Sequence, residues 1–230
     1  MCGRFAITLP SDAMAQLFSA RPDNDLPEVP DYNVCPTTGI HVVTGGADVP
    51  RRLTMMRWGF LPRWYKKPAG GPLLINARGE TIAEKPAFRD AVRHRRALVV
   101  ADGFYEWTKT PDGARNPWYI APADGGPMVM AAVWQEWTGP EGETLRTCAV
   151  VTTAANPKMA TIHHRMPVIL RTEDIALWLG EEGHGAAVLM KAAPEEHLTF
   201  YRVARTVNSN RASGPELIRP LSDEAAAAES

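Results

Sequence analysis

Cysteine is scarce in this sequence of 230 residues, and the three cysteines, Cys2, Cys35 and Cys148, lie far apart. Their odd number argues against a disulfide framework, and the absence of a C-x-x-C pair argues against structural zinc. A glycine-rich phosphate loop is missing as well. We therefore expect a chain that uses neither a metal ion nor any other cofactor.

Long hydrophobic runs are also missing. No apolar stretch approaches the roughly 20 residues that are needed to cross a bilayer. The first twenty residues include Arg4, Asp12 and Gln16 and contain no long apolar segment, which argues against a secretory signal. We expect no membrane partner and a cytoplasmic location.

Neither sign of charge is in large excess, since 25 Lys and Arg stand against 26 Asp and Glu. The last nine residues, SDEAAAAES, contain three acids and no base. The rest of the chain therefore has a slight positive excess, which does not demand a polyanionic partner but is compatible with nucleic acid in a local groove. We expect residues 222–230 to be a disordered, acidic and alanine-rich tail.

Short apolar, β-branched or aromatic runs recur between residues 41 and 170, with turns such as PDG at 111–113 and GPEGE at 139–143 between them. This alternation is typical of antiparallel strands and hairpins. Helical patterns are fewer, and no βαβ rhythm is present; the helices are expected within 11–20, 83–96, 172–179 and 194–204. We predict one α+β domain over residues 1–221, in which mainly antiparallel strands form a barrel-like mixed sheet with a few flanking helices.

The position of Cys2 raises a chemical question. Removal of the initiator methionine would leave Cys2 with a free α-amine and a thiol on neighbouring carbons, a pairing that no internal cysteine offers. The alternative is a small apolar residue buried in an N-terminal strand, where free cysteines are common. The rest of the sequence has to decide between these two interpretations.

Four stretches combine polar residues with turns or aromatics in a way that a plain core does not need. They are MCGRF at 1–5, INARGE at 75–80, ADGFYEW at 101–107 and TIHHRMPVIL at 161–170. In the second, Asn76 follows an apolar, strand-like segment. In the fourth, His163 and His164 precede a turn closed by proline, and we expect one of these histidines to be exposed.

Glu106 lies between Tyr105 and Trp107, at the end of a run that should be largely buried. Burial beside aromatic rings disfavours the charged form of a carboxylate, so the pKa tends upward into the range of general acid–base catalysis. The alternative is a glutamate on an edge strand that faces water.

Five motifs occur in the order found in one family: MCGRF, WGFLPRWY, INARGET, ADGFYEW and IHHRMPVIL, followed by GPELIRP. On these motifs the chain resembles, from residue 1 to about 221, the SRAP family of SOS-response-associated peptidase-like or abasic-site processing proteins. The resemblance implies a DNA-damage-response protein that recognises abasic sites in single-stranded DNA, including junctions with duplex. It also implies a covalent DNA–protein crosslink through the N-terminal cysteine. We expect a monomer, located at the nucleoid if the source is bacterial.

The resemblance assigns two groups of residues. The catalytic group comprises Cys2, Asn76, Glu106 and His163, and the DNA-binding group comprises Arg4, Asn33, Pro36, Trp64, Tyr65, Arg78 and Arg165. Among the latter, the arginines would hold phosphates, the two aromatics would wedge into the base stack, and the remaining two would border the site. Tyr65 stands where a second tryptophan is often found, and Cys35 stands where alanine is expected.

The chemistry can be argued without the family. An α-amine has a pKa of about 7.7 to 8.0 against about 10.4 for lysine, so near neutral pH it is uncharged a few hundred times more often. It can therefore attack the open-chain aldehyde of an abasic sugar, and the neighbouring thiol can close a five-membered thiazolidine on the resulting imine. His163 suits ring opening, Glu106 suits proton transfer in imine formation, and Asn76 suits orientation. The first two roles can be exchanged without contradicting the sequence.

Two other functions fit the same residues. One is an N-terminal-cysteine peptidase or amidohydrolase, in which Cys2 attacks, His163 acts as base and Glu106 orients it, with activity that includes release of Met1. Lyase activity on the DNA belongs to the same enzymatic class of alternatives. The other is a DNA-end or junction-binding module whose cysteine is only structural.

Overall fold

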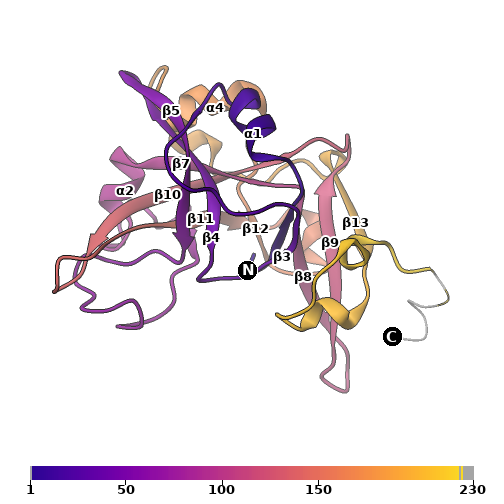
Figure 1. Ribbon diagram of the computed structural model, residues 1–230. Helices are drawn as coiled ribbons and strands as arrows, with labels where there is room; N and C mark the ends of the chain where they lie inside the picture. The colour runs from indigo at the N-terminus through magenta and orange to yellow at the C-terminus, as the bar shows by residue number, and fades with distance from the viewer. Residues whose placement is uncertain (1, 223, 225–230) are drawn as a thin grey trace.

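Five strands close into a mixed barrel in the computed structural model, which describes residues 2–222 and 224 (Figure 1). They are β4 (Gly39–Gly46), β5 (Val49–Trp58), β7 (Arg96–Ala101), β10 (Met128–Thr138) and β11 (Thr144–Ala154). Antiparallel pairing runs from β5 through β4, β7 and β10 to β11. A parallel pairing of β11 with β5, where Cys148 lies opposite Trp58, closes the barrel.

Three short strands extend the barrel wall: β2 (Arg21–Pro22) beside β5, and β6 (Asn76–Arg78) and β12 (Arg165–Pro167) beside β11. Thr152 of β11 lies opposite Arg78 in β6 and opposite Pro167 in β12. Because a strand residue has only two edges, β6 and β12 flank the end of β11 on opposite sides. This arrangement brings the second and fourth of the polar motifs to one place.

A second, fully antiparallel sheet lies beside the barrel and has the order β13-β9-β8-β1-β3 (Figure 1). Its strands are β1 (Phe5–Ile7), β3 (Asp31–Val34), β8 (Gly103–Lys109), β9 (Arg115–Pro122) and β13 (Leu198–Arg202). The chain passes from the barrel strand β7 into β8 through a single residue, Asp102. The two sheets are therefore parts of one α+β domain, and the predicted fold class is confirmed.

The helices are short and lie at the periphery. The α-helices are α1 (Ser11–Leu17), α2 (Arg89–His94), α3 (Pro157–Ala160) and α4 (Ile175–Leu179); the 3₁₀ helices are η1 (Thr172–Asp174), η2 (Ala186–Leu189), η3 (Glu195–His197), η4 (Arg205–Asn208) and η5 (Pro215–Ile218). None of the described helices is long and apolar enough to span a membrane. Of the predicted tail, Asp223 and residues 225–230 lie outside the described residues, so its disorder stays a prediction.

One predicted helix is wrong. Residues 194–204 contain a single 3₁₀ turn followed by β13, which pairs with β9 so that Phe200 lies opposite Ile120. The run LTFY is rich in aromatic and β-branched residues, which favour a strand once a neighbouring edge is available. Ser11 also does not cap α1 through its side chain; its Oγ instead lies 3.1 Å from Nε2 of His41.

Strand alternation on β8 separates two hydrophobic cores. Phe104 belongs to the large core that joins the barrel to the second sheet, and Tyr105 belongs to a small core on the sheet's other face. The sheets meet where the rings of Phe5 and Trp58 lie 5.1 Å apart. Because successive side chains point to opposite faces, Glu106 lies on the Phe104 face, toward the barrel. A carboxylate is thereby placed between the two sheets.

Candidate active site

Cys2 is fully buried between the barrel and the second sheet. Burial and the nearby negative charge of Glu106 raise the pKa of its thiol well above the usual range, and a hydrogen bond from the main chain of Arg4 opposes this only in part. The thiol is therefore protonated at neutral pH. Cysteines 35 and 148 are also free thiols.

Asn76, the first residue of β6, holds the main chain of Cys2. Its Nδ2 donates a hydrogen bond of 2.8 Å to the Cys2 carbonyl oxygen. The Oδ1 of the same amide is buried and accepts no hydrogen bond from the described residues. One end of the amide thus fixes the start of the chain, and the other end is available to a donor from the terminal amine or from a ligand.

Glu106 is only 3 % exposed, and its Oε1 lies 4.0 Å from Nδ1 of His163. The imidazole follows α3, whose first turn is capped by Asn156 Oδ1 on the Met159 N–H at 2.8 Å. The ring of the exposed His164 stacks on that of His163 at 4.3 Å between centroids.

The orientation of the His163 ring is set by its neighbour along the chain. The main-chain N–H of Arg165 lies 3.0 Å from Nδ1 of His163 and points to it as a donor. The Arg165 carbonyl oxygen lies 3.2 Å from the same Nδ1, so this nitrogen accepts from the N–H in one tautomer and donates to the carbonyl in the other. Burial lowers the pKa of His163, while the negative charge of Glu106 partly opposes the effect. The neutral imidazole therefore predominates at pH 7.

The four residues of the predicted catalytic group thus meet from four separate segments. Cys2 comes from the N-terminus, Asn76 from β6, Glu106 from β8 and His163 from the loop before β12. The hydrogen bond between the first two, the 4.0 Å approach between the last two, and the effect of Glu106 on the Cys2 thiol connect them. Their individual roles stay predictions.

Arg4 lies on the other face of the second sheet. Its Nη1 donates to Asn33 Oδ1 at 2.6 Å and to the Val207 carbonyl at 2.9 Å, and its guanidinium lies 5.8 Å from the Trp107 ring centroid. Asn33 in turn donates from Nδ2 to the carbonyls of Ser209 and Ala212. The arginine and asparagine are therefore fixed against the C-terminal segment.

The two remaining arginines have contrasting environments. Arg78 is exposed and forms no ion pair with any residue that the structure describes. Arg165 is 8 % exposed, and both ends of its guanidinium contact Glu80, with Nη1 to Oε1 at 2.6 Å and Nη2 to Oε2 at 2.8 Å. Its Nε has no hydrogen-bond acceptor within the described part of the chain.

The aromatic pair lies in the loop between β5 and β6. Trp64 is 59 % exposed, and Tyr65 is half-buried, with its hydroxyl donating to the Pro72 carbonyl at 3.1 Å. The two rings meet edge to face at 6.4 Å. Pro36 is half-buried in the turn after β3. Trp64 is thus the side chain of this group that is free to stack on another molecule.

The sequence model of the family described as SOS response associated peptidase (SRAP) matches residues 1–210. The chain belongs to the SRAP family.

Relatives of this SRAP chain carry a common description. The abasic site processing protein YoqW of Bacillus subtilis is 36 % identical over 95 % of this chain and 99 % of its own. The abasic site processing protein YedK of Escherichia coli is 33 % identical over 96 % of this chain and 100 % of its own. A crystal structure of a protein from Bacteroides thetaiotaomicron shares the fold, with a TM-score of 0.83 and 24 % identity over 96 % of this chain and 100 % of that one.

Sequence reasoning on this SRAP chain missed Glu80. The motif INARGE ends on this carboxylate, but its partner Arg165 lies 85 positions away, and no local signal links them. Thr152, whose carbonyl also accepts from Arg165 at 2.8 Å, was missed for the same reason. The usable signal was a carboxylate two residues after an arginine in a motif already rich in polar groups.

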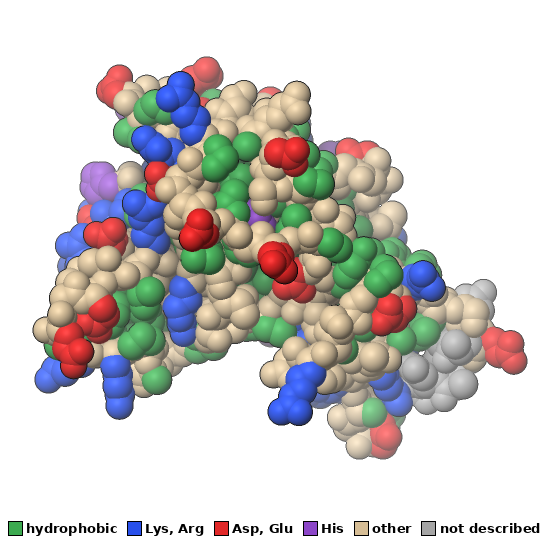
Figure 2. All heavy atoms as spheres, in the orientation of Figure 1, with side chains coloured by type: hydrophobic (Ala, Val, Ile, Leu, Met, Phe, Trp, Pro, Cys, Tyr) green, Lys and Arg blue, Asp and Glu red, His purple; other side chains and the backbone are tan. Residues whose placement is uncertain are grey.

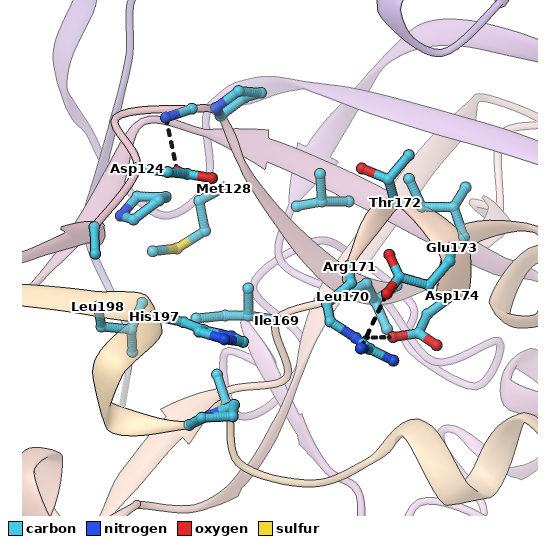
Figure 3. Close-up of a pocket in the computed structure, with 18 of the residues that line it drawn as sticks. Asp124, Met128, Ile169, Leu170, Arg171, Thr172, Glu173, Asp174, His197 and Leu198 are labelled. Carbon is cyan, nitrogen blue, oxygen red and sulfur yellow. Dashed lines mark hydrogen bonds and ion pairs between the residues drawn. The ribbon is translucent and has the colours of Figure 1, made fainter.

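A cavity of about 540 Å³ lies away from these residues. It is lined by parts of 122–129, 169–175 and 189–198, with Arg171 paired to Glu173 and Asp174 at its edge (Figure 3). Cys2 and Glu106 do not line it. The outline of the molecule is also indented between the barrel and the second sheet (Figure 2). The catalytic group lies at the junction of the two sheets and not in this cavity.

Proposed function

We propose that this chain processes abasic sites in single-stranded DNA by forming a covalent crosslink between Cys2 and the open-chain aldehyde of the damaged sugar. Removal of Met1 would make Cys2 the first residue. The observation that carries the proposal is the meeting of the buried Cys2 and Glu106 with the half-buried Asn76 and His163 in one cluster. Relatives named as abasic site processing proteins support the choice of substrate and a role in the DNA damage response.

The first step is attack by the terminal amine. Asn76 holds the Cys2 carbonyl, and its buried Oδ1 offers an acceptor to an N–H of the amine. The amine lone pair adds to the aldehyde carbon, one amine proton passes to the oxygen, and loss of water leaves an imine. Glu106 can carry these protons because it lies close enough to Cys2 for its negative charge to raise the pKa of the thiol.

The second step is addition of the thiol across the imine. The S–H proton moves to the imine nitrogen while sulfur bonds to the former aldehyde carbon, so aldehyde and aminothiol become a thiazolidine and one water. The raised pKa of Cys2 keeps the proton on sulfur until this step. Because thiol and imine belong to one residue, the closure has a very large effective concentration.

His163 suits the opening of the sugar ring. A neutral imidazole has one unprotonated ring nitrogen, which can take the hydroxyl proton at the anomeric carbon and then give that proton to the ring oxygen, so the ring is neutral again after the step. The lowered pKa of His163 favours the neutral form that starts this transfer. The negative charge of the neighbouring Glu106 stabilises the transient imidazolium.

DNA would be held without reading of its sequence. The arginines Arg4, Arg78 and Arg165 would contact phosphates, and Trp64 with Tyr65 would stack on bases at a single strand or junction. Asn33 and Pro36 would border the lesion. Trp64 is largely exposed, and Arg78 forms no ion pair among the described residues. Both side chains are therefore available for the first contacts with DNA. We propose that the protein acts as a cytoplasmic monomer.

A cysteine peptidase is less well supported. Such an enzyme needs a thiolate, and thiolates form where positive charge lowers the thiol pKa. The environment of Cys2 does the opposite, because burial and Glu106 raise its pKa. An imine carries its own base, because its nitrogen takes the thiol proton as sulfur adds to the carbon, whereas a peptide offers no such acceptor for the proton.

Intact mass spectrometry with a denaturing gel tests the proposal. The untagged protein is mixed with a single-stranded oligonucleotide that bears one abasic site, beside Cys2→Ala, the control Cys35→Ala and an N-terminally tagged form. We expect an adduct only for wild type and Cys35→Ala, with the mass of the chain without Met1 plus the oligonucleotide minus one water. Retention of Met1, or no adduct, would overturn the proposal. Non-covalent retardation alone would favour a binding module, and peptide turnover a hydrolase.

A further inference from the structure

The Glu80 carboxylate joins two of the segments that build the active site. Its two oxygens contact Nη1 and Nη2 of Arg165 at 2.6 and 2.8 Å, and Oε1 also accepts from the Ala154 N–H at 3.2 Å. This bidentate contact lowers the pKa of Glu80 to about 2, so the carboxylate is ionised throughout the neutral and mildly acidic range. Glu80 itself is half-exposed and forms no hydrogen bond or ion pair with the catalytic group within the described residues.

The position of this ion pair in the fold gives it a mechanical role. Glu80 follows β6, the strand of Asn76, and Arg165 begins β12, directly after the loop of His163. Between these strands runs the end of β11, where the Thr152 carbonyl accepts from Arg165 Nη2 at 2.8 Å. The pair therefore spans β11 and sets how the two flanking strands lie relative to each other.

Arg165 connects this ion pair to the imidazole of His163. Its side chain is anchored by Glu80, and its main-chain N–H donates to Nδ1 of His163 at 3.0 Å. The hydrogen bond at one ring nitrogen decides which nitrogen carries the proton. A shift of the Arg165 backbone would therefore change both the tautomer of His163 and its 4.0 Å approach to Glu106.

We propose that Glu80 is a positioning residue for the crosslinking reaction, which acts through Arg165 to hold the His163 ring against the Arg165 main chain and at its 4.0 Å approach to Glu106. This inference rests on the proposed function. Glu80 neither touches the substrate nor exchanges a proton with it. Glu80 occupies both terminal nitrogens of the Arg165 guanidinium, and Nε has no acceptor among the described residues. A phosphate would therefore meet the single Nε–H and not the pair of terminal nitrogens.

A second ion pair in the same chain provides a matched control. Glu181 contacts Arg51 in the same bidentate manner, at 2.7 and 2.6 Å, and ties β5 to the segment after α4. In the described part of the chain, Glu181 forms no hydrogen bond or ion pair with the catalytic group. Glu80→Gln and Glu181→Gln each replace one carboxylate by an amide of the same shape, but only the first acts on the link to His163.

The test combines nitrogen NMR of the His163 ring without DNA and single-turnover crosslinking as a function of pH. We expect wild type and Glu181→Gln to show the same ratio of His163 tautomers. We expect Glu80→Gln to change that ratio, to shift the pH midpoint of the rate and to slow crosslinking about tenfold, since misplacement of a group by about 1 Å can cost about a hundredfold. Glu80→Asp keeps the negative charge, so its tautomer ratio and crosslinking rate should lie between those of wild type and Glu80→Gln. This variant provides the test if Glu80→Gln does not fold.

Two outcomes separate this inference from the proposed function. If wild type crosslinks while Glu80→Gln keeps the tautomer, midpoint and rate of Glu181→Gln, the positioning role is overturned and the proposed function stands. If wild type forms no adduct, the proposed function falls, and the NMR comparison still decides whether Glu80 controls the tautomer of His163.

Discussion

Asn76 donates its side-chain Nδ2–H to the main-chain carbonyl of Cys2 across 2.8 Å, which ties the start of the chain to the barrel wall. Because β6 pairs in parallel with β11, with Asn76 opposite Val150, the amide is itself held by the most extensively paired part of the barrel. The reactive end of the chain is thereby fixed by a rigid element, which reduces the ordering that the reaction would otherwise require.

Asn76→Ala should slow crosslinking without unfolding the protein. A lost hydrogen bond of this kind is worth about 0.5–1.5 kcal/mol, which corresponds to a decrease of about twofold to tenfold in single-turnover rate. Asn24→Ala is the control, since Asn24 bonds the main chain of Met55 on the surface. Equal rates for the two variants would remove Asn76 from the mechanism.

Glu106→Gln should slow crosslinking and leave DNA binding intact. The change keeps the shape of the side chain but removes the base, and general acid–base groups contribute about a hundredfold or more. Since the charge of Glu106 raises the pKa of His163, the NMR titration midpoint of His163 should fall in this variant. Binding is measured by fluorescence anisotropy on an oligonucleotide with a stable abasic analogue. An unchanged rate would exclude Glu106 as a proton carrier.

The crosslinking rate should rise from pH 6 to about 9 and then level off, because the terminal amine is half neutral at its pKa of about 7.7 to 8.0 and almost fully neutral one pH unit above it. The raised pKa of the Cys2 thiol means that it stays protonated over this range, so its ionisation adds no second rise. Protonation of His163 contributes to the loss at the acidic end only below its ordinary value, because its pKa is lowered. A rate that falls from pH 6 to 8 would contradict the amine as nucleophile.

Trp64→Ala should weaken binding of single-stranded DNA and leave the melting temperature unchanged. Stacking of a base on an aromatic ring is worth about 1–3 kcal/mol. The ring is largely exposed, so its removal opens no cavity. Leu73→Ala, an exposed apolar residue at the far end of the same loop, is the control. Equal affinities of both variants in an anisotropy titration would argue that the wedge lies elsewhere.

The sequence predicted the fold class because short apolar runs and turn residues record strand pairing between neighbours. It predicted a barrel-like sheet but not which strands close it, since β5 and β11 pair across about ninety positions and nothing local specifies their register. Glu106 was correctly placed in a buried run because strand alternation and its aromatic neighbours are local properties. The helix predicted within 194–204 was wrong for the opposite reason, since pairing with the distant strand β9 decides the conformation of this segment.

Arg165 illustrates the same limit at the candidate site. Arginines are rarely buried unless they are paired, and sequence alone gave an arginine beside a turn with no sign of a partner. The structure supplies Glu80 from a motif 85 positions earlier and thereby explains the burial. Identities of polar groups are thus visible in the sequence, whereas the pairing that orients them depends on which strands flank β11.

Asn33→Ala should separate stability from chemistry at the other face of the second sheet. Asn33 is buried and receives Arg4 Nη1 at 2.6 Å while donating to the carbonyls of Ser209 and Ala212, so alanine would leave these groups without their partner. Because unsatisfied buried groups cost about 1–3 kcal/mol each, and a chain of this size loses roughly 2–4 °C per kcal/mol, the melting temperature should fall by several degrees. Release of Arg4 should also weaken DNA binding. Calorimetry checks the fall in melting temperature, with Asn24→Ala as the control, and anisotropy checks the weaker DNA binding. An Asn33→Ala variant that melts like wild type would show that the C-terminal segment is held by its apolar contacts with Tyr105 and Tyr119 alone.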